Sequence, residues 1–230
     1  MEWNRNILSK IDFEDIKNEE EKKSVAEKIA NKIKDGDIIG FGSGSTAYLT
    51  IQAIAEKMQK ENIKITAIPT SYEVELLCNF LNIPTTTLQN AKPDWSFDGA
   101  DEVNQDNWMI KGRGGAMFRE KLNIANSTIT YILVDKTKLV KKLGENFTIP
   151  VECYPGSLNY VKEELLILGA KSVEIRKAEK KDGPIITESG NVILDARFDE
   201  ISEHLEKDIK SITGVIESGL FIGYPVEVIS

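Results

Sequence analysis

The sequence predicts an α/β protein built from a doubly wound, mostly parallel sheet and a smaller α+β domain. Up to about residue 135, short buried strands alternate with amphipathic helices, as in parallel sheets with helices on both faces. From about Thr148 the order becomes strand–helix–strand–strand–helix, which is typical of small antiparallel domains. We therefore expect the doubly wound domain to comprise residues 1–147 and 212–230, and the small domain to comprise residues 148–211.

The elements of the doubly wound domain follow from periodicity and turn residues. Apolar residues recur at helical spacing over residues 24–34, and Asp35-Gly36 ends this helix. The elements expected after it are a strand at 37–41, a helix at 46–60, a strand at 65–70, a helix at 71–82 and strands at 95–103 and 128–135. The polar, aperiodic residues 1–20 indicate a tail or a loosely docked first segment.

The small domain is predicted from shorter segments. Its expected elements are a strand at 149–154, a helix at 156–169, a strand at 171–177, two strands within 184–198 around the turn Ser189-Gly190-Asn191, and a helix at 199–210. The tail from Gly214 onward is expected to return one or two strands to the doubly wound domain.

Composition excludes several classes of protein. No run of about 18 apolar residues is present to span a membrane, and the charged N-terminus lacks the apolar region of a secretory signal. The formal net charge of -8 argues against a nucleic-acid surface. With one histidine and two cysteines far apart, a zinc site is not expected, and a reducing compartment is the simpler location. We expect a cytoplasmic protein with no membrane, nucleic-acid or metal partner.

The first candidate site is the segment from Gly40 to Thr46 (GFGSGST), between a buried strand and a helix. Backbone N–H groups at such a turn bind anions together with the positive end of the helix dipole. The hydroxyls of Ser43, Ser45 and Thr46 add donors. The segment matches neither a Walker A loop nor a dinucleotide-binding fingerprint. Two alternatives stay open: a phosphate site, or a tight turn whose Ser-Thr pair caps the helix.

The second candidate is DGADE, at the end of a predicted strand. Asp98 and Asp101 flank Gly99 and Ala100, a spacing that lets both carboxylates face one cavity. Such a pair binds sugar hydroxyls or exchanges protons with them, and Gly99 allows close approach of a ligand. The alternatives are a capping aspartate in a solvated turn, or half of a cation site.

The third candidate, KGRGGAMFREK from Lys111 to Lys121, carries the most information. Three glycines place backbone amides beside the charge of Lys111, which is the equipment that stabilises an oxyanion such as an enediolate. A helix begins near Ala116, so Glu120 lies about one turn into it and is a candidate general base. A glycine-rich surface loop before a salt-bridged helix is the alternative. Lys138, after another buried strand, is either a phosphate contact or a solvated loop charge.

Taken together, these segments resemble ribose-5-phosphate isomerase type A. GFGSGSTA, TSYEVELL, FDGADEV, KGRGGAMFREK, ILVDKTKLVKKLG, IPVEC, GNVILD and GVIESGLF match that family in order and spacing over nearly the whole chain. The resemblance implies a homodimer or homotetramer that works without metal or organic cofactor, with a Rossmann-like domain and a smaller ferredoxin-like domain. It also implies interconversion of the phosphosugars ribose 5-phosphate and ribulose 5-phosphate, in the non-oxidative pentose phosphate pathway.

The resemblance assigns roles to single residues. Glu120 moves a proton between C1 and C2, Asp98 assists ring opening, and Lys111 with the loop amides holds the enediolate. The residues implied to contact substrate are Ser43, Gly44, Ser45, Thr46, Asp98, Gly99, Ala100, Asp101, Lys111, Gly112, Arg113, Gly114 and Lys138. Lys22, upstream of the first predicted helix, matches a family lysine that reaches the phosphate.

The chain departs from the family pattern at three positions. Ser43 replaces a threonine and keeps the hydroxyl, while Ser218 replaces a histidine common in the family, so position 218 is not expected to be essential. Arg113 replaces a glycine, and a positive φ there would cost about 1–2 kcal/mol.

Two other functions compete with the isomerase. A non-catalytic sugar-phosphate sensor domain would normally follow a helix-turn-helix, for which the stretch before residue 24 is too short. A relative of acyl-CoA transferases would need a binding region long enough for coenzyme A, and the sequence shows no such region.

Overall fold

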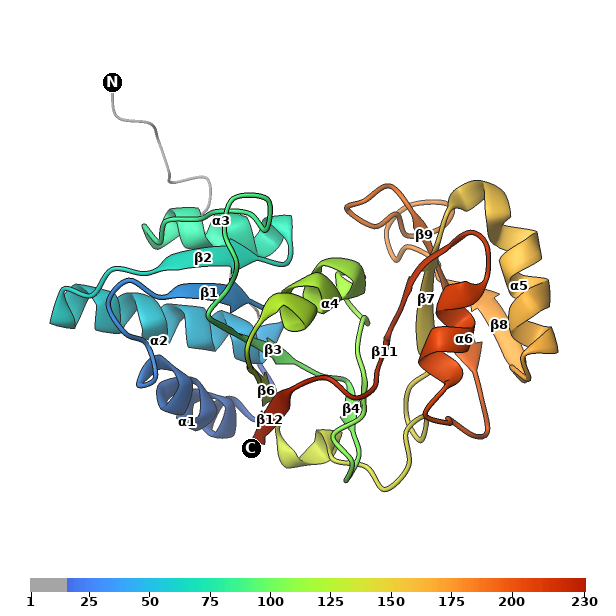
Figure 1. Ribbon diagram of the computed structural model, residues 1–230, viewed down its shortest axis with the longest axis horizontal. Coiled ribbons are helices and arrows are strands. Elements are labelled where there is room, and N and C mark those ends of the chain that lie inside the picture. Colours follow the sequence, from blue (N-terminus) through green and yellow to red (C-terminus); the bar gives the residue numbers. More distant parts are fainter. Residues whose placement is uncertain (1–15) are drawn as a thin grey trace. The chain divides into compact units, whose positions relative to one another are not determined.

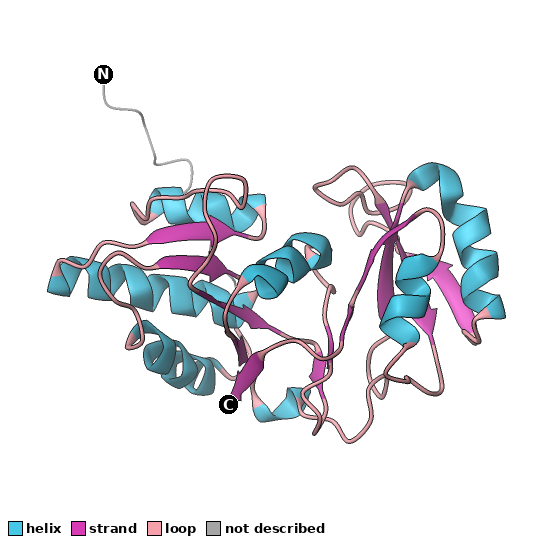
Figure 2. Cartoon of the chain, in the orientation of Figure 1, coloured by secondary structure: helices cyan, strands magenta, loops and turns pink. Residues whose placement is uncertain are grey.

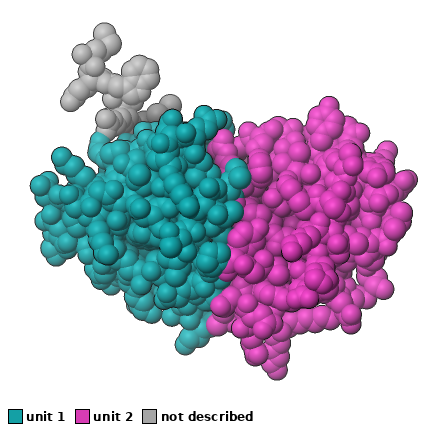
Figure 3. Space-filling model, viewed as in Figure 1, with its two compact units in different colours: residues 1–99, 122–136, 225–230 teal, residues 100–121, 137–224 magenta. Residues whose placement is uncertain are grey.

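The computed structural model describes residues 16–230 and divides into two units, coloured separately in Figure 3. Unit 1 contains the chain up to Gly99 together with Leu122–Lys136 and Pro225–Ser230, and unit 2 contains Ala100–Lys121 and Thr137–Tyr224. The domain boundaries expected from the sequence assign more of the chain to the doubly wound part, and they stay a prediction. The predicted tail at residues 1–20 lies outside the described residues, except for residues 16–20.

Unit 1 is built on a five-stranded parallel sheet in the order β12-β6-β3-β1-β2 (Figure 1). Its strands are β1 (Ile38–Phe41), β2 (Thr66–Pro69), β3 (Trp95–Gly99), β6 (Thr130–Leu133) and β12 (Val226–Ile229). The chain passes from β1 outward to β2 and then returns across β1 to β3, so the strand order reverses between β1 and β3. Ligands of such sheets bind at the carboxyl ends of the strands at this point. The predicted doubly wound sheet is confirmed.

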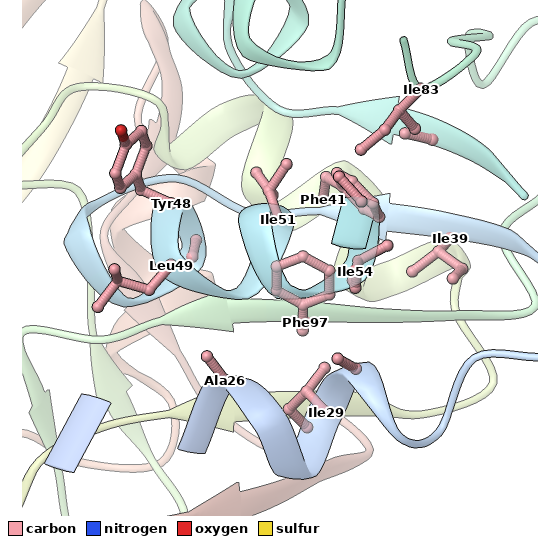
Figure 4. Close-up of a cluster of buried hydrophobic side chains, with 14 of the residues drawn as sticks. Ala26, Ile29, Ile39, Phe41, Tyr48, Leu49, Ile51, Ile54, Ile83 and Phe97 are labelled. Carbon is pink, nitrogen blue, oxygen red and sulfur yellow. The ribbon is translucent and has the colours of Figure 1, made fainter. Parts of the chain in front are cut away.

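Helices pack on both faces of this sheet, as right-handed crossovers require (Figures 1 and 2). They are α1 (Glu19–Ala30), α2 (Ser45–Glu61), α3 (Tyr72–Phe80) and α4 (Met117–Asn126), and the unit boundary falls inside α4. Figure 4 shows Ile29 of α1, Ile54 of α2 and Phe97 of β3 in one buried cluster. The helix predicted at 24–34 starts earlier, at Glu19, because an acidic first turn favours the helix N-terminus, and it ends at Ala30.

Unit 2 contains a four-stranded antiparallel sheet in the order β10-β7-β9-β8. In chain order its elements are β7 (Ile149–Cys153), α5 (Leu158–Ile167), β8 (Ser172–Ile175), β9 (Val192–Arg197), α6 (Leu205–Ser211) and β10 (Val215–Ser218). This order and sheet arrangement are ferredoxin-like, so the smaller α+β fold is confirmed. Val161 of α5, Leu194 of β9 and Ile209 of α6 belong to its separate buried core.

Three short strands form a second sheet in unit 2, in the order β11-β5-β4. They are β4 (Glu102–Val103), β5 (Met109–Ile110) and β11 (Leu220–Phe221), and two 3₁₀ turns, η2 (Lys136–Lys138) and η3 (Pro155–Ser157), complete the elements. The Glu102 carboxylate accepts hydrogen bonds from the backbone N–H groups of Gly144 (2.6 Å), Asn146 (2.5 Å) and Phe147 (3.0 Å). The last residue of the DGADE motif is therefore a buried loop anchor.

Several predicted elements have different limits in the structure. The strand expected at 95–103 is interrupted and forms β3 and β4. Of the two strands expected within 184–198, only β9 forms, and Pro184 and Ile186 make isolated bridges, because proline lacks the N–H that a ladder needs. The helix expected at 199–210 begins at Leu205.

The C-terminal tail divides its strands between the two units. β12 joins the parallel sheet as expected, whereas β10 and β11 pair inside unit 2. Of the helices in residues 16–230, none combines the length and the apolar character that crossing a membrane requires.

Candidate active site

The turn after β1 places an open helix N-terminus in unit 1. Gly44 is the N-cap of α2 with φ 91°, a conformation that favours glycine, and it has no side chain with which to cap the helix. The first N–H groups of a helix have no partner within it and carry the positive end of the dipole. Lys22 lies in α1, not upstream of it, and its Nζ donates to Ser45 Oγ at 2.9 Å. The N-cap position is therefore occupied by glycine and not by Ser or Thr, and binding of an anion at this turn stays a prediction.

Asp98 is the penultimate residue of β3 and lies next to this turn. Its side chain is 2% exposed, and Oδ1 accepts hydrogen bonds from the backbone N–H groups of Ser43 (3.2 Å) and Gly99 (2.8 Å). A Cβ on Gly42 would overlap the Asp98 carboxylate, so the second glycine of the turn is needed for this approach. The first and second motifs thus meet within unit 1, where the strand order reverses.

Lys111 and Glu120 form a buried ion pair in unit 2. Lys111 Nζ lies 3.1 Å from Glu120 Oε2, and the two residues are 3% and 5% exposed. Lys111 directly follows β5, and its N–H donates to the Gly219 carbonyl at 2.9 Å. Glu120 lies in the first turn of α4, where its N–H donates to the Ala116 carbonyl. The predicted lysine and glutamate of the third motif are in direct contact.

The glycine loop between them avoids the strain expected at Arg113. Gly112 has φ 101° and Gly115 has φ 82°, whereas Arg113 is not among the described residues with positive φ. The N–H of Arg113 donates to Asp101 Oδ2 at 3.1 Å, and the N–H of Gly115 donates to the Gly112 carbonyl at 3.0 Å. The arginine at this position is therefore compatible with the turn, because Gly112 and Gly115 supply the left-handed conformations of the loop.

Asp101 has a raised pKa. Burial of its carboxylate is the main cause, and the charge of Glu120 acts in the same direction. The Arg113 N–H and the charges of Lys111 and Lys138 oppose this shift without cancelling it. The second motif therefore contributes a carboxylate to unit 2 that is less acidic than an exposed aspartate.

Lys138 ends the 3₁₀ turn η2, and its Nζ lies 5.1 Å from the centroid of the Phe147 ring. Ala100 links Asp98 to Asp101 and lies on the unit 2 side of the boundary. Among the residues from 16 to 230, no group of three or more His, Cys, Asp or Glu side chains is placed to hold a metal ion.

Two side chains at this site are not among the predicted site residues: Arg176 belongs to no motif, and Asp195 is the last residue of GNVILD, for which no site role is predicted. Arg176 follows β8 and Asp195 lies in β9, and both line the same pocket of about 550 Å³ as Asp101 and Arg113. Isolated charges on predicted strands of a small domain usually face solvent, so the sequence offers no signal for them.

Fold and site define a class of protein: an α/β enzyme with a glycine-capped helix N-terminus in one unit, and a buried carboxylate–ammonium pair beside a glycine loop in the other. Residues 66–230 match the family model described as ribose 5-phosphate isomerase A (phosphoriboisomerase A). A ribose-5-phosphate isomerase A of Prochlorococcus marinus is 44% identical over 90% of this chain and 89% of its own length. The namesake of Methanocaldococcus jannaschii is 42% identical over 90% of this chain and 92% of its own.

Solved structures of ribose 5-phosphate isomerases have the same fold as this chain. The ribose 5-phosphate isomerase A of Methanocaldococcus jannaschii superimposes with a TM-score of 0.88 and 40% identity, covering 92% of this chain and 95% of that one. A D-ribose-5-phosphate isomerase in complex with phospho-erythronic acid also gives 0.88, with 37% identity and coverage of 93% and 95%. The chain belongs to the ribose 5-phosphate isomerase A family.

Proposed function

We propose that this chain interconverts D-ribose 5-phosphate and D-ribulose 5-phosphate through an enediolate, the reaction for which its family is named. The observation that carries the proposal is the buried Lys111–Glu120 pair beside a glycine loop. A buried ion pair is a weak source of stability, because desolvation offsets most of the attraction between the charges. Its presence in a family of isomerases favours a chemical role.

The chemistry requires a base, a return path for the proton and stabilisation of an oxyanion. The Glu120 carboxylate removes the proton from C2 of the open-chain aldose, and the electron pair moves into the C1–C2 bond as the C1 carbonyl becomes an enediolate oxygen. The same carboxylate returns the proton to C1 while the proton of the C2 hydroxyl passes to O1, a transfer that Asp98 assists. The C2 oxygen thereby becomes the carbonyl of the ketose, and no cofactor is needed. Lys111 and the amides of Gly112, Arg113 and Gly114 stabilise the negative charge.

The remaining site residues bind the rest of the substrate. The turn residues Ser43, Gly44, Ser45 and Thr46 hold the phosphate, with Lys22 and Lys138 as countercharges. Asp98 and Asp101 contact sugar hydroxyls, and Asp98 assists ring opening.

Phospho-erythronic acid, found with a related isomerase, is a useful probe. Its carboxylate has two oxygens on one planar carbon, as the enediolate has two oxygens on planar carbons. We expect this chain to bind it through the residues that stabilise the enediolate. A sugar-phosphate sensor would need no buried base, and no observation favours that function.

We also propose a metal-independent, cytoplasmic homo-oligomer of the pentose phosphate pathway. The ammonium of Lys111 supplies the positive charge that a metal ion would otherwise provide, and a divalent cation beside it would be repelled. Cys78 and Cys153 are both buried free thiols, as a reducing compartment favours.

A coupled assay tests this function. Purified protein, dialysed against EDTA, is given ribose 5-phosphate, and formation of ribulose 5-phosphate is followed with and without added magnesium, manganese or zinc. Turnover that does not depend on added metal is expected. Absence of turnover under all conditions would contradict the isomerase, and turnover that only a metal restores would contradict the proposed roles of Asp98, Asp101 and Lys111.

A further inference from the structure

Arg176 connects the ferredoxin-like sheet to the glycine loop within unit 2. Its guanidinium Nη1 donates to the carbonyl oxygens of Gly112 (2.8 Å) and Arg113 (2.9 Å). On the other edge of the guanidinium, Nε donates to Asp195 Oδ2 at 2.9 Å and Nη2 donates to Asp195 Oδ1, so the carboxylate is bound through both of its oxygens. Both side chains are mostly buried, at 16% and 23% exposure. One arginine thus holds two successive peptide groups of the loop and is itself fixed by a strand of the sheet.

These contacts determine where the loop N–H groups point. In a trans peptide the N–H points away from the carbonyl of the same plane. The carbonyl of Gly112 shares its plane with the N–H of Arg113, which donates to Asp101 on the opposite side. The carbonyl of Arg113 shares its plane with the N–H of Gly114, which is directed away from Arg176 by the same rule. Arg176 therefore binds the carbonyl oxygens of the two peptide groups whose N–H groups, on the opposite side, are proposed to face the substrate.

We propose that Arg176, held by Asp195, is a positioning residue that fixes the peptide orientation of the oxyanion-stabilising loop. This inference rests on the proposed isomerase function. Arg176 acts on the reaction through the loop carbonyls and has no contact with substrate. Asp195 acts one step further away, by fixing the plane of the guanidinium.

The loop needs side-chain contacts that fix its conformation, because it is rich in glycine. Gly112 and Gly115 adopt positive φ, and glycine has more conformational freedom to lose than any other residue. Stabilisation of an oxyanion requires donors that are already oriented before charge develops. Arginine suits this task because its planar guanidinium offers two edges in fixed geometry, which an ammonium does not.

A positioning role predicts a specific kinetic pattern. The enediolate charge exists only near the transition state, so disorder of the loop should lower kcat and kcat/KM together. Phosphate binding does not involve this loop, so KM should change little. Displacement of reacting groups by about 1 Å reduces rates by about 10²-fold, so we expect losses between about tenfold and about 10²-fold.

The test compares Arg176→Lys and Asp195→Asn with Arg197→Lys. Arg197 lies on the same strand as Asp195 and also donates to a backbone carbonyl, that of Gly144, outside the glycine loop. For each protein we would measure kcat and KM, the affinity for phospho-erythronic acid, the circular dichroism spectrum and the Tm. Wild-type turnover is established first, because its absence would contradict the proposed function itself.

The expected result is a fall in kcat for both Arg176→Lys and Asp195→Asn, with a matching loss of phospho-erythronic acid affinity and a nearly unchanged KM. Arg197→Lys should retain wild-type kinetics. Three results would overturn the inference while leaving the isomerase function intact. They are wild-type kcat in both variants, a rise in KM without a change in kcat, or a loss of activity that follows a loss of folded protein and occurs equally in Arg197→Lys.

Discussion

Glu120 is 5% exposed, and it forms an ion pair with Lys111, a lysine that is itself buried. An exposed pair of this kind would be worth at most about 1 kcal/mol, and burial adds a desolvation cost to each member. The arrangement is therefore understandable as a base kept in a water-poor position beside the charge that stabilises its product. The neighbouring Lys121 also forms a buried ion pair, with Glu217. Its ammonium additionally donates to Glu206 and to the Leu220 carbonyl, so all three of its N–H donors have partners within the protein, as in a structural lysine.

The first prediction concerns Glu120→Gln. The amide keeps the size of the side chain and cannot accept the C2 proton, so kcat should fall by about 10²- to 10⁴-fold. The affinity for phospho-erythronic acid should fall far less than kcat, since the phosphate contacts are untouched. Steady-state kinetics and isothermal titration calorimetry measure the two quantities. Isomerisation near the wild-type rate would remove Glu120 from the role of base.

A second prediction uses the raised pKa of Asp101, which burial causes. Because the folded pKa lies above the unfolded value, the ionised carboxylate destabilises the fold at neutral pH. This penalty is lost as pH falls through the folded pKa and is absent below the unfolded value. Asp101→Asn should therefore have a higher Tm than wild type at pH 7, while losing activity. The amide oxygen can still accept the N–H of Arg113.

The pH dependence provides the control for this prediction. Every other titrating group is shared by the two proteins, so the difference in Tm isolates position 101. Thermal unfolding by circular dichroism between pH 7 and pH 4 should show the advantage of Asp101→Asn shrinking as pH falls. An advantage that grows toward acid would mean that the ionised carboxylate stabilises the fold.

At the scale of elements, the loop between β5 and α4 depends on which glycine adopts which conformation. Gly112 has φ 101°, and a Cβ there would lie 3.0 Å from Met117. Gly114 does not have a positive φ, and no described atom lies within 4 Å of a Cβ built on it. The two glycines are two residues apart in one loop, so they form a matched pair.

We predict that Gly112→Ala destabilises the fold by about 1–2 kcal/mol, which corresponds to about 2–4 °C in Tm per kcal/mol for a chain of this size. Gly114→Ala should leave the Tm near that of wild type, because its backbone conformation is ordinary and the space is open. Thermal unfolding of both variants under identical conditions measures the difference. Equal losses of Tm in the two variants would indicate that backbone conformation does not decide the stability of this loop.

The sequence predicted most elements, because their signals are local. Helical spacing and turn residues located α2 (Ser45–Glu61) and α3 (Tyr72–Phe80) within one or two residues of their observed ends. The helix expected at 199–210 failed in its first half, where Ile201 packs against the core of unit 2 outside any helix. Burial through tertiary contacts overrode local periodicity there, and a single sequence does not carry that information.

The candidate site shows the same division between local and distant information. Asp98, Lys111 and Glu120 stood out because glycines and strand ends mark them locally. Arg176 and Asp195 were missed, because the hydrogen bond from Arg176 to the Gly112 carbonyl joins segments 64 residues apart, and Asp195 reaches the loop only through Arg176. Hydrogen bonds from a side chain to a distant backbone carbonyl place no constraint on the type of the accepting residue, so they leave no motif.

For the whole molecule, the division into two units does not follow the order of the chain. The chain passes from one unit to the other after Gly99, Lys121, Lys136 and Tyr224. The edge strand β12 of the parallel sheet comes after all of unit 2, and α4 contributes residues to both units. Each unit is thus made of segments that are covalently interrupted by the other, and we expect the two to unfold together.

The cysteines allow this expectation to be measured, because each unit contains one. Cys78 is buried in the core of unit 1 and Cys153 in the core of unit 2. Burial raises the pKa of Cys78 to about 12 and that of Cys153 to about 11. Since the thiolate is the reactive form, neither should react with Ellman's reagent at pH 8 in the native protein. Single Cys78→Ala and Cys153→Ala variants leave one reporter each.

In a urea series, both reporters should become reactive over the same concentration range as the loss of the circular dichroism signal. Unfolding of unit 2 would leave β12 at the end of a long unfolded segment, which raises the entropic cost of holding it at the edge of the parallel sheet, so unit 1 should not persist alone. Because each alanine variant can also shift the midpoint of unfolding, each thiol transition is compared with the dichroism transition of the same variant. Reaction of Cys153 at a urea concentration that leaves Cys78 protected, with part of the dichroism signal retained, would show that the two units unfold independently despite their interrupted chain order.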